Sequence, residues 1–138
     1  MRNWGTKLAI GLTLLAMGAA GWLCLWPHLE LWYFRREFVT YIKSGSGGYY
    51  AAAGRLAACR SDLAAEACWE LVEDGSMPAH ARGALLEMSG QVASSRTDEK
   101  YRASARGLCE KYLANPDHRL RRSAAEGLCQ MGDARALP

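Results

Sequence analysis

The sequence has no stretch in which apolar and polar residues alternate as they do in a half-buried β-strand. Beyond residue 48 it is instead rich in alanine, which favours helix. Ser61 is placed to cap the start of a helix, while Gly90 and Gly132 are placed to end one. We therefore expect an all-α fold, with helices over Tyr49–Cys59, Ser61–Asp74, Pro78–Ser89, Asp98–Leu113 and Asp117–Met131.

The motifs of common enzyme and metal sites are also missing. No paired-carboxylate, nucleophile-elbow, phosphate-loop or metalloprotease pattern occurs. His28, His80 and His118 are isolated, and none has a second ligand at helical spacing. The acidic residues between Glu66 and Asp74 are explained by a solvated helix face. We expect no catalytic residue, no metal, no cofactor and no small-molecule substrate.

The sequence has no C-x-x-C pair, which leaves a zinc or thioredoxin-like site without support. Four cysteines follow the first 50 residues: Cys59, Cys68, Cys109 and Cys129. In an exported domain this even number permits two disulfides, and the sequence does not separate the three possible pairings. The alternative is that they are small buried core residues, because a free cysteine packs like a small hydrophobe.

Residues 8–26 contain no charged side chain. As a helix this run spans roughly 28 Å, close to the thickness of a bilayer's hydrocarbon core. It predicts a transmembrane helix over 8–27 that ends or kinks at Pro27, because proline has no backbone N–H to donate within a helix. Gly11, Gly18 and Gly21 are small residues that permit close packing on other membrane helices.

The basic tail, residues 1–7, also resembles the start of a signal peptide, and Gly18-Ala19-Ala20 resembles a cleavage site. A retained anchor is favoured over cleavage because the apolar run continues through Trp26. Basic residues near the two ends of the run are nearly balanced. We expect a single-pass protein of a bacterial inner (cytoplasmic) membrane, with the N-terminus inside and the domain outside the cytoplasm.

The excess of positive charge lies entirely within the first 43 residues, because the remainder has as many acidic as basic side chains. A neutral domain gives no electrostatic reason to bind nucleic acid. Basic side chains beside the apolar run favour a lipid bilayer with anionic headgroups. The predicted anchor and interface residues are Trp22, Trp26, Trp32, Tyr33, Arg35 and Arg36.

The juxtamembrane segment, residues 28–43, has one apolar stripe at helical spacing. It predicts either an amphipathic helix lying on the headgroups or the first helix of the soluble domain, and one helix could do both. Residues 44–48 are a flexible Gly/Ser linker by composition, and 49–138 form the helical domain. The stripe consists of Leu31, Phe34, Phe38, Tyr41 and Ile42.

The domain contains an internal echo with a period of about 20 residues, typical of helix pairs in an α-solenoid. Residues 105–109 (ARGLC) align with 125–129 (AEGLC), which makes Cys109 and Cys129 the favoured disulfide pair. An unrelated alanine-rich helical bundle is the alternative. The last segment, 115–136, reads NPDHRLRRSAAEGLCQMGDARA.

This segment resembles a HEAT-like repeat of the phycobilisome-lyase type, in which a Gly-Asp-x-Arg-Ala turn opens the next helix. The resemblance is good over 115–136, loose over 78–114, and implies a small HEAT-like α-solenoid. Gly127 and Cys129 depart from the usual small-residue pattern. We expect Arg121 or Arg122 to reach Asp117 or Asp133. The motif residues are Asp117, Arg121, Ala125, Gly132, Asp133 and Arg135.

These features together predict a non-enzymatic, membrane-anchored accessory or scaffolding subunit of a larger membrane protein complex. Its partners would be integral membrane proteins, and the end of the repeat at Pro138 could be covered by one of them. The first alternative is an inhibitor or immunity-type protein that binds one soluble toxin. The second, suggested by family resemblance and the cysteines, is a chromophore-lyase or thiol-based activity.

Overall fold

The computed structural model describes residues 4–59 and 63–133, in which every regular element is an α-helix. This confirms the all-α prediction. Ser61, the predicted cap, and Arg135 of the HEAT-like motif lie outside the described residues. The helices are α1 (Trp4–Ser44), α2 (Tyr49–Ala58), α3 (Ala64–Glu73), α4 (Ala79–Ser95), α5 (Glu99–Tyr112) and α6 (His118–Gln130).

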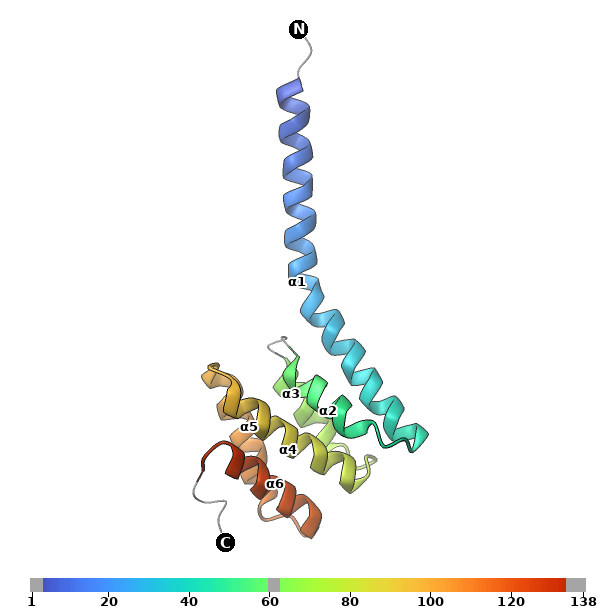
Figure 1. The fold of residues 1–138 in the computed structure, drawn as a ribbon, viewed down its shortest axis with the longest axis vertical. Coiled ribbons are helices and arrows are strands. Elements are labelled where there is room, and N and C mark those ends of the chain that lie inside the picture. The colour runs from blue at the N-terminus through green and yellow to red at the C-terminus, as the bar shows by residue number, and fades with distance from the viewer. Residues whose placement is uncertain (1–3, 60–62, 134–138) are drawn as a thin grey trace.

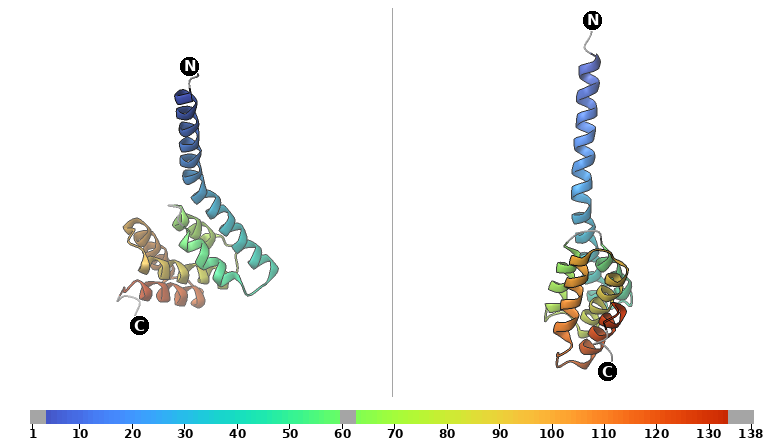
Figure 2. Two further views of the ribbon diagram at one scale, coloured as in Figure 1. Left: turned by 45° about the horizontal axis from the view of Figure 1, so that its top comes forward. Right: turned by 90° about the vertical axis from the view of Figure 1, so that its left-hand side faces the viewer.

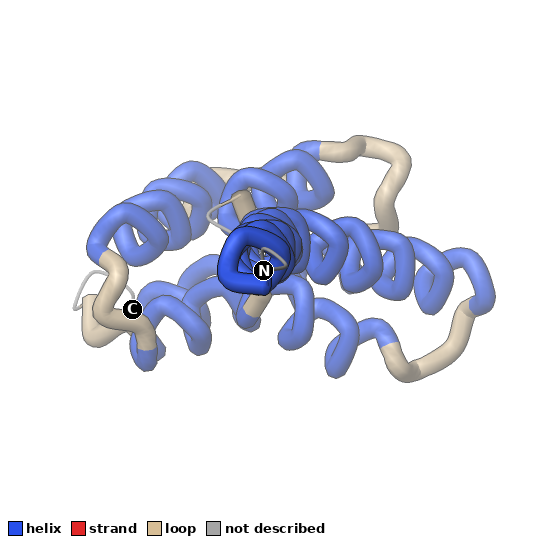
Figure 3. Tube along the Cα trace, turned by 90° about the horizontal axis from the view of Figure 1, so that it is seen from above, coloured by secondary structure: helices blue, strands red, loops and turns tan. Residues whose placement is uncertain are grey.

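The longest helix, α1, continues through Pro27, so the apolar run and the juxtamembrane segment form one helix. Its axis changes direction in the light-blue middle section (Figure 1). A proline inside a helix removes one backbone hydrogen bond and its ring clashes with the preceding turn, which accounts for a bend. The N-terminal half of α1 projects away from the other helices (Figure 1), and from above it is seen end-on (Figure 3).

The C-terminal half of α1 packs against α2 as the first helix of the helical domain (Figure 2). Phe38 is fully buried, and the other four residues of the predicted stripe pack against the core around it. The stripe is therefore not available to headgroups, which decides against an interfacial helix that uses this face. Residues from α2 complete the contact, with Ala52, Ala53 and Leu56 all fully buried.

The remaining helices pack in a regular order. Helices α2, α4 and α6 contact one another in succession, while α3 and α5 contact each other and both contact α4. The tightest approach is between α4 and α6, where small residues face each other. The core that results is made mainly of alanine and leucine, and it includes Leu120, Leu128 and Met131 of the repeat-like segment.

The segment 44–48, which was predicted as a Gly/Ser linker, forms a turn between α1 and α2 that contains backbone hydrogen bonds. Gly45 has a φ of +65°. The Ser46 amide donates to the Tyr41 carbonyl at 3.3 Å and the Gly45 amide donates to the Ile42 carbonyl at 3.2 Å, which is the Schellman arrangement. Gly48 lies against the Tyr41 ring, so a side chain there would collide with it.

The two predicted C-terminal glycines behave differently. Gly132 has a φ of +75° and ends α6 as expected, with the Asp133 amide donating to the Leu128 carbonyl at 3.0 Å. Gly90 does not end a helix: α4 continues to Ser95, and Gly90 is buried within it. The prediction for Gly90 was wrong because a glycine is also favoured where two helices approach closely.

The C-terminal ends of α2 and α3 are each contacted by one tyrosine and one arginine side chain. The Tyr101 hydroxyl donates to the Ala57 carbonyl at 2.9 Å, and the Tyr112 hydroxyl donates to the Val72 carbonyl at 3.1 Å. An arginine packs over each ring, Arg96 on Tyr101 and Arg82 on Tyr112. Each guanidinium also donates to a carbonyl at the same helix end, where a positive charge is favoured.

Candidate membrane and partner interface

The described apolar residues of α1 that precede Pro27 are exposed in this chain. Every residue from Ile10 to Trp26 is exposed, and the helix contains an 18-residue window of mean hydropathy 1.6 with none of it buried. Among the described residues α1 is the one helix long and apolar enough to cross a membrane, a property that signal sequences share. None of the other described helices covers this surface.

The predicted aromatic residues lie on α1 on both sides of Pro27, with Trp22 and Trp26 before it and Trp32 and Tyr33 after it. The rings of Trp22 and Trp26 lie 5.3 Å apart. Trp32 and Tyr33 are each 58% exposed although they lie beside the folded domain. Large aromatic side chains this exposed are unusual unless they contact a partner or a membrane interface.

Arg35 and Arg36 are adjacent in sequence but have different surroundings. Arg35 forms an ion pair with Glu70 of α3, with 2.9 Å between nitrogen and oxygen. The Arg36 guanidinium instead lies over the Trp32 ring, 5.3 Å from its centroid. Arg36 is therefore directed toward the aromatic surface, whereas Arg35 helps to hold α1 against α3.

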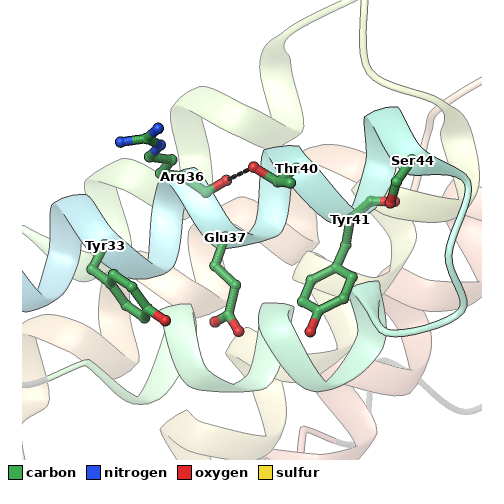
Figure 4. A pocket seen from close by; sticks show the side chains of 6 residues that line it. All are labelled: Tyr33, Arg36, Glu37, Thr40, Tyr41 and Ser44. Carbon is green, nitrogen blue, oxygen red and sulfur yellow. Dashed lines mark hydrogen bonds between the residues drawn. The ribbon is translucent and has the colours of Figure 1, made fainter.

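One groove follows the junction of α1 and α2. It has a volume of about 420 Å³. Glu37 accepts two hydrogen bonds from Arg55 of α2, at 3.0 and 2.8 Å, and this contact raises the pKa of Arg55. Figure 4 shows Tyr33 and Tyr41 on either side of Glu37, with Arg36 directed away. Because Glu37 is already paired with Arg55, it does not offer an open negative charge to a ligand.

A second groove, of about 460 Å³, follows the outer face of α1. It combines three cationic side chains with an indole ring and a hydroxyl, and its lining includes no carboxylate. The sequence predicted its two arginines and its tryptophan as interface residues but omitted the rest. The remaining lining residues could have been identified from their helical spacing on the face opposite the apolar stripe. The lining residues are Trp32, Arg35, Arg36, Val39, Thr40 and Lys43.

The small residues predicted to pack on other membrane helices are on the exposed part of α1. A Cβ added at Gly11, Gly18 or Gly21 would meet nothing within 4 Å. These positions are thus open in the chain itself, as a surface for another helix requires.

The residues of the HEAT-like motif form local structure around α6, with partners that differ from those expected. Asp117 caps the helix by accepting from the Arg119 amide at 2.8 Å. Arg121 donates to the carbonyls of Asn115 and Pro116 rather than to a carboxylate. Asp133 pairs with Arg106 of α5 at 3.6 Å, so neither Arg121 nor Arg122 is its ion-pair partner.

Arg122 pairs instead with Glu126 on its own helix, at 2.8 Å. Ala125 is half-buried in α6. The expected reach of Arg121 or Arg122 to an aspartate was therefore wrong. Local backbone acceptors and a carboxylate one turn away were closer to these side chains.

The cysteines do not form the favoured disulfide. Cys109 is buried with its thiol 3.8 Å from the Leu86 carbonyl, whereas Cys129 is exposed, and both are reduced. Cys59 and Cys68 are also buried, as the core alternative requires. Burial raises the pKa of the Cys68 and Cys109 thiols to about 12. Such thiols are poor nucleophiles at neutral pH, so these two do not support a thiol-based activity.

The described residues contain no group of three or more histidine, cysteine or acidic side chains arranged to hold a metal ion. Comparisons of this chain with family models, with curated proteins and with solved structures find no match. The residues with the strongest claim to function are therefore those of α1 itself.

Proposed function

We propose that this chain is a non-enzymatic, membrane-anchored accessory or scaffolding subunit of a larger membrane protein complex. The observation that carries the proposal is the exposed apolar half of α1, Ile10–Trp26. A contiguous apolar surface of this length is costly in water and marks a site of membrane or protein contact. A helix is also the form in which a single segment satisfies its backbone hydrogen bonds within lipid.

The way in which α1 continues into the domain supports a scaffolding role. Its C-terminal half carries Phe38 in the core, and the turn at Gly45 is closed by backbone hydrogen bonds. The anchor and the domain therefore share one helix, with no flexible segment between them. An anchor of this kind holds the domain close to the membrane and in one orientation.

The proposed HEAT-like character of the domain is supported by the order of its contacts. In an α-solenoid each helix pair contacts its neighbours in sequence, and the succession of α2, α4 and α6 has this form. The Gly132-Asp133 turn, which ends α6, is also the turn that the resemblance implies. Such domains offer extended surfaces for protein partners.

We further propose integral membrane proteins as partners, with contacts through the open small residues Gly11, Gly18 and Gly21. The proposed location is a bacterial inner membrane, with the N-terminus inside. A reporter fused after Pro138 tests the orientation, because its activity depends on which side of the membrane it reaches.

The decisive experiment is extraction of the native protein. Wild-type chain is expected in the membrane fraction after an alkaline wash, and a gentle detergent extract should contain it together with integral membrane proteins at fixed stoichiometry. Leu14→Arg/Leu15→Arg places two charges within the apolar run. Inserting an arginine at the centre of a membrane helix costs about 2.5–3.5 kcal/mol, so this variant should be released from the membrane fraction. Arg119→Leu, a single change of charge at an exposed position of the domain, should not.

Recovery of the wild-type chain in the aqueous fraction, or a mature polypeptide that begins near residue 21, would overturn the proposal. Migration as an isolated membrane protein until a soluble target is added would favour the inhibitor alternative instead.

A further inference from the structure

The face of α1 opposite the buried stripe is continuous from the apolar run to the end of the helix. At about 100° per residue its members fall within roughly one third of the helix circumference. We call this face the outer stripe. It consists of Trp22, Leu25, Trp26, Leu29, Trp32, Tyr33, Arg36, Thr40 and Lys43, all of them exposed.

The chemistry of the outer stripe changes in one direction along the helix. Leucine and tryptophan come first, Trp32 and Tyr33 follow, and Arg36 and Lys43 come last. A bilayer changes in the same order, from hydrocarbon through the interface preferred by aromatic rings to the headgroup phosphates. Arg36 is about 15 Å of helix beyond Trp26. The bend inclines this half of α1 relative to the first half (Figure 1). A long arginine side chain can place its charge some distance from its own backbone.

The charge of the outer stripe is positive because the carboxylates of α1 lie elsewhere. Glu37 is bound to Arg55, and Glu30 lies 3.8 Å from the Cys59 thiol on the domain side. Arg36 and Lys43 have no carboxylate within ion-pair distance among the described residues. The open groove of about 460 Å³ is lined by these two cationic side chains together with the indole of Trp32 and the hydroxyl of Thr40.

We propose that the outer stripe lies on the membrane surface and that this groove binds the phosphodiester headgroup of an anionic phospholipid. Arg36 and Lys43 supply the positive charge, and Trp32 lies at the level of the interface. The domain then lies on the side of α1 opposite the outer stripe. This inference rests on the proposed membrane anchoring, and it adds the class of lipid and the face that meets it.

Continuity with the apolar run favours a lipid occupant over an acidic protein surface. The stripe begins inside the proposed membrane segment and continues on the same face to Arg36, about 15 Å of helix beyond Trp26. Charge also favours anionic lipid, because juxtamembrane lysine and arginine residues are attracted to the surface potential of such membranes.

The test measures how fast a cysteine placed on the stripe reacts with a water-soluble maleimide. Full-length Thr40→Cys, in a background of Cys24→Ser and Cys129→Ser, is reconstituted into vesicles of phosphatidylcholine alone or with 30% phosphatidylglycerol. Labelling is expected to be about fivefold slower in the anionic vesicles, because the headgroups cover the stripe. The same chain with Ala103→Cys instead, on the exposed face of α5, should label equally in both.

Two further arms identify the cause. Arg36→Gln/Lys43→Gln should abolish the difference at position 40, whereas the matched double change Lys100→Gln/Arg119→Gln should leave it intact. Inorganic phosphate added to the phosphatidylcholine vesicles should not slow the reaction, because the site is proposed for a headgroup held at the membrane surface.

Flotation of each sample after an alkaline wash reports anchoring separately. Stable flotation with equal labelling rates in both lipids would overturn the lipid site and leave the anchor in place. Slow labelling caused by inorganic phosphate alone would assign the groove to a free anion and overturn the proposal. Loss of flotation in both lipids would overturn both proposals.

Discussion

Gly90 of α4 and Gly127 of α6 face each other where the two helices are closest. A Cβ built on Gly90 would lie 2.4 Å from both the Cα and the carbonyl oxygen of Gly127. Gly127 is in turn close to the Leu86 carbonyl and to the Cys109 thiol, with a built Cβ 2.9 Å from each. The backbones therefore approach to a distance that any side chain at either position would prevent.

Replacement of either glycine by alanine is expected to destabilise the domain. Gly90→Ala must push α6 away from α4, because the colliding atoms belong to backbone rather than to a flexible side chain. Overpacking of this kind costs about 1–3 kcal/mol, and occasionally more. Chemical denaturation of the detergent-solubilised chain, followed by circular dichroism, measures the loss.

Gly107→Ala on α5 is the matched control. A Cβ at Gly107 meets nothing within 4 Å, so alanine should stabilise the helix by about 0.5–1 kcal/mol. Equal effects of the two substitutions, in either direction, would contradict the close approach of α4 and α6.

These glycines also show what can be predicted from sequence here. The helices after residue 48 were predicted well because alanine content and capping residues such as Asp117 act locally. Gly90 was wrongly predicted to end a helix. Its role at a close helix contact depends on Gly127 of α6, which is distant in sequence, so the local pattern could not distinguish it from a C-cap. The outer stripe was predicted only in part, from its aromatic and arginine residues. The sequence did not show whether the apolar stripe of residues 28–43 packs on the domain or on a membrane, so it did not show which face of the helix stays exposed.

The two tyrosine hydroxyls at helix ends should contribute unequally. The Val72 carbonyl, which accepts from Tyr112, also accepts from Arg82, so Tyr112→Phe leaves it with a partner. At the other helix end Arg96 binds the Cys59 carbonyl, while Tyr101 binds that of Ala57. Tyr101→Phe is therefore expected to cost about 1–3 kcal/mol and Tyr112→Phe only about 0.5–1.5 kcal/mol.

The same denaturation measurement compares the two variants. Adding Arg82→Met to Tyr112→Phe should cost more than the sum of the separate changes, since the Val72 carbonyl then loses both donors. A larger loss for Tyr112→Phe than for Tyr101→Phe would contradict this account.

Stability should fall in alkaline solution because of the buried thiols. Burial raises the pKa of Cys68 and Cys109 to about 12, whereas an exposed thiol in the unfolded chain has a pKa of about 8.5. Since the folded pKa is the higher one, the unfolded state loses protons first as the pH rises. The stabilisation is complete below about pH 8.5 and is lost between there and about pH 12.

The free energy of unfolding measured from pH 7 to pH 11 tests this dependence. Cys68→Ala should make the decline shallower, while Cys129→Ala, at an exposed position, should leave its slope unchanged. An identical slope in wild type and Cys68→Ala would rule out this thiol as a cause of the decline.

The two ion pairs of α1 should differ in their contribution to its position on the domain. Glu37 is bound by Arg55 through two hydrogen bonds and its side chain is only 20% exposed, whereas Arg35 and Glu70 are 47% and 62% exposed. Exposed pairs contribute about 0–1 kcal/mol, and a two-point arginine–carboxylate contact lies at or above the top of that range. We expect Glu37→Gln to cost about 1 kcal/mol and Arg35→Gln less than about half as much. Double-mutant cycles with Arg55→Gln and Glu70→Gln measure both coupling energies, and a stronger coupling for Arg35–Glu70 would show that α3, rather than α2, holds the anchor helix in place.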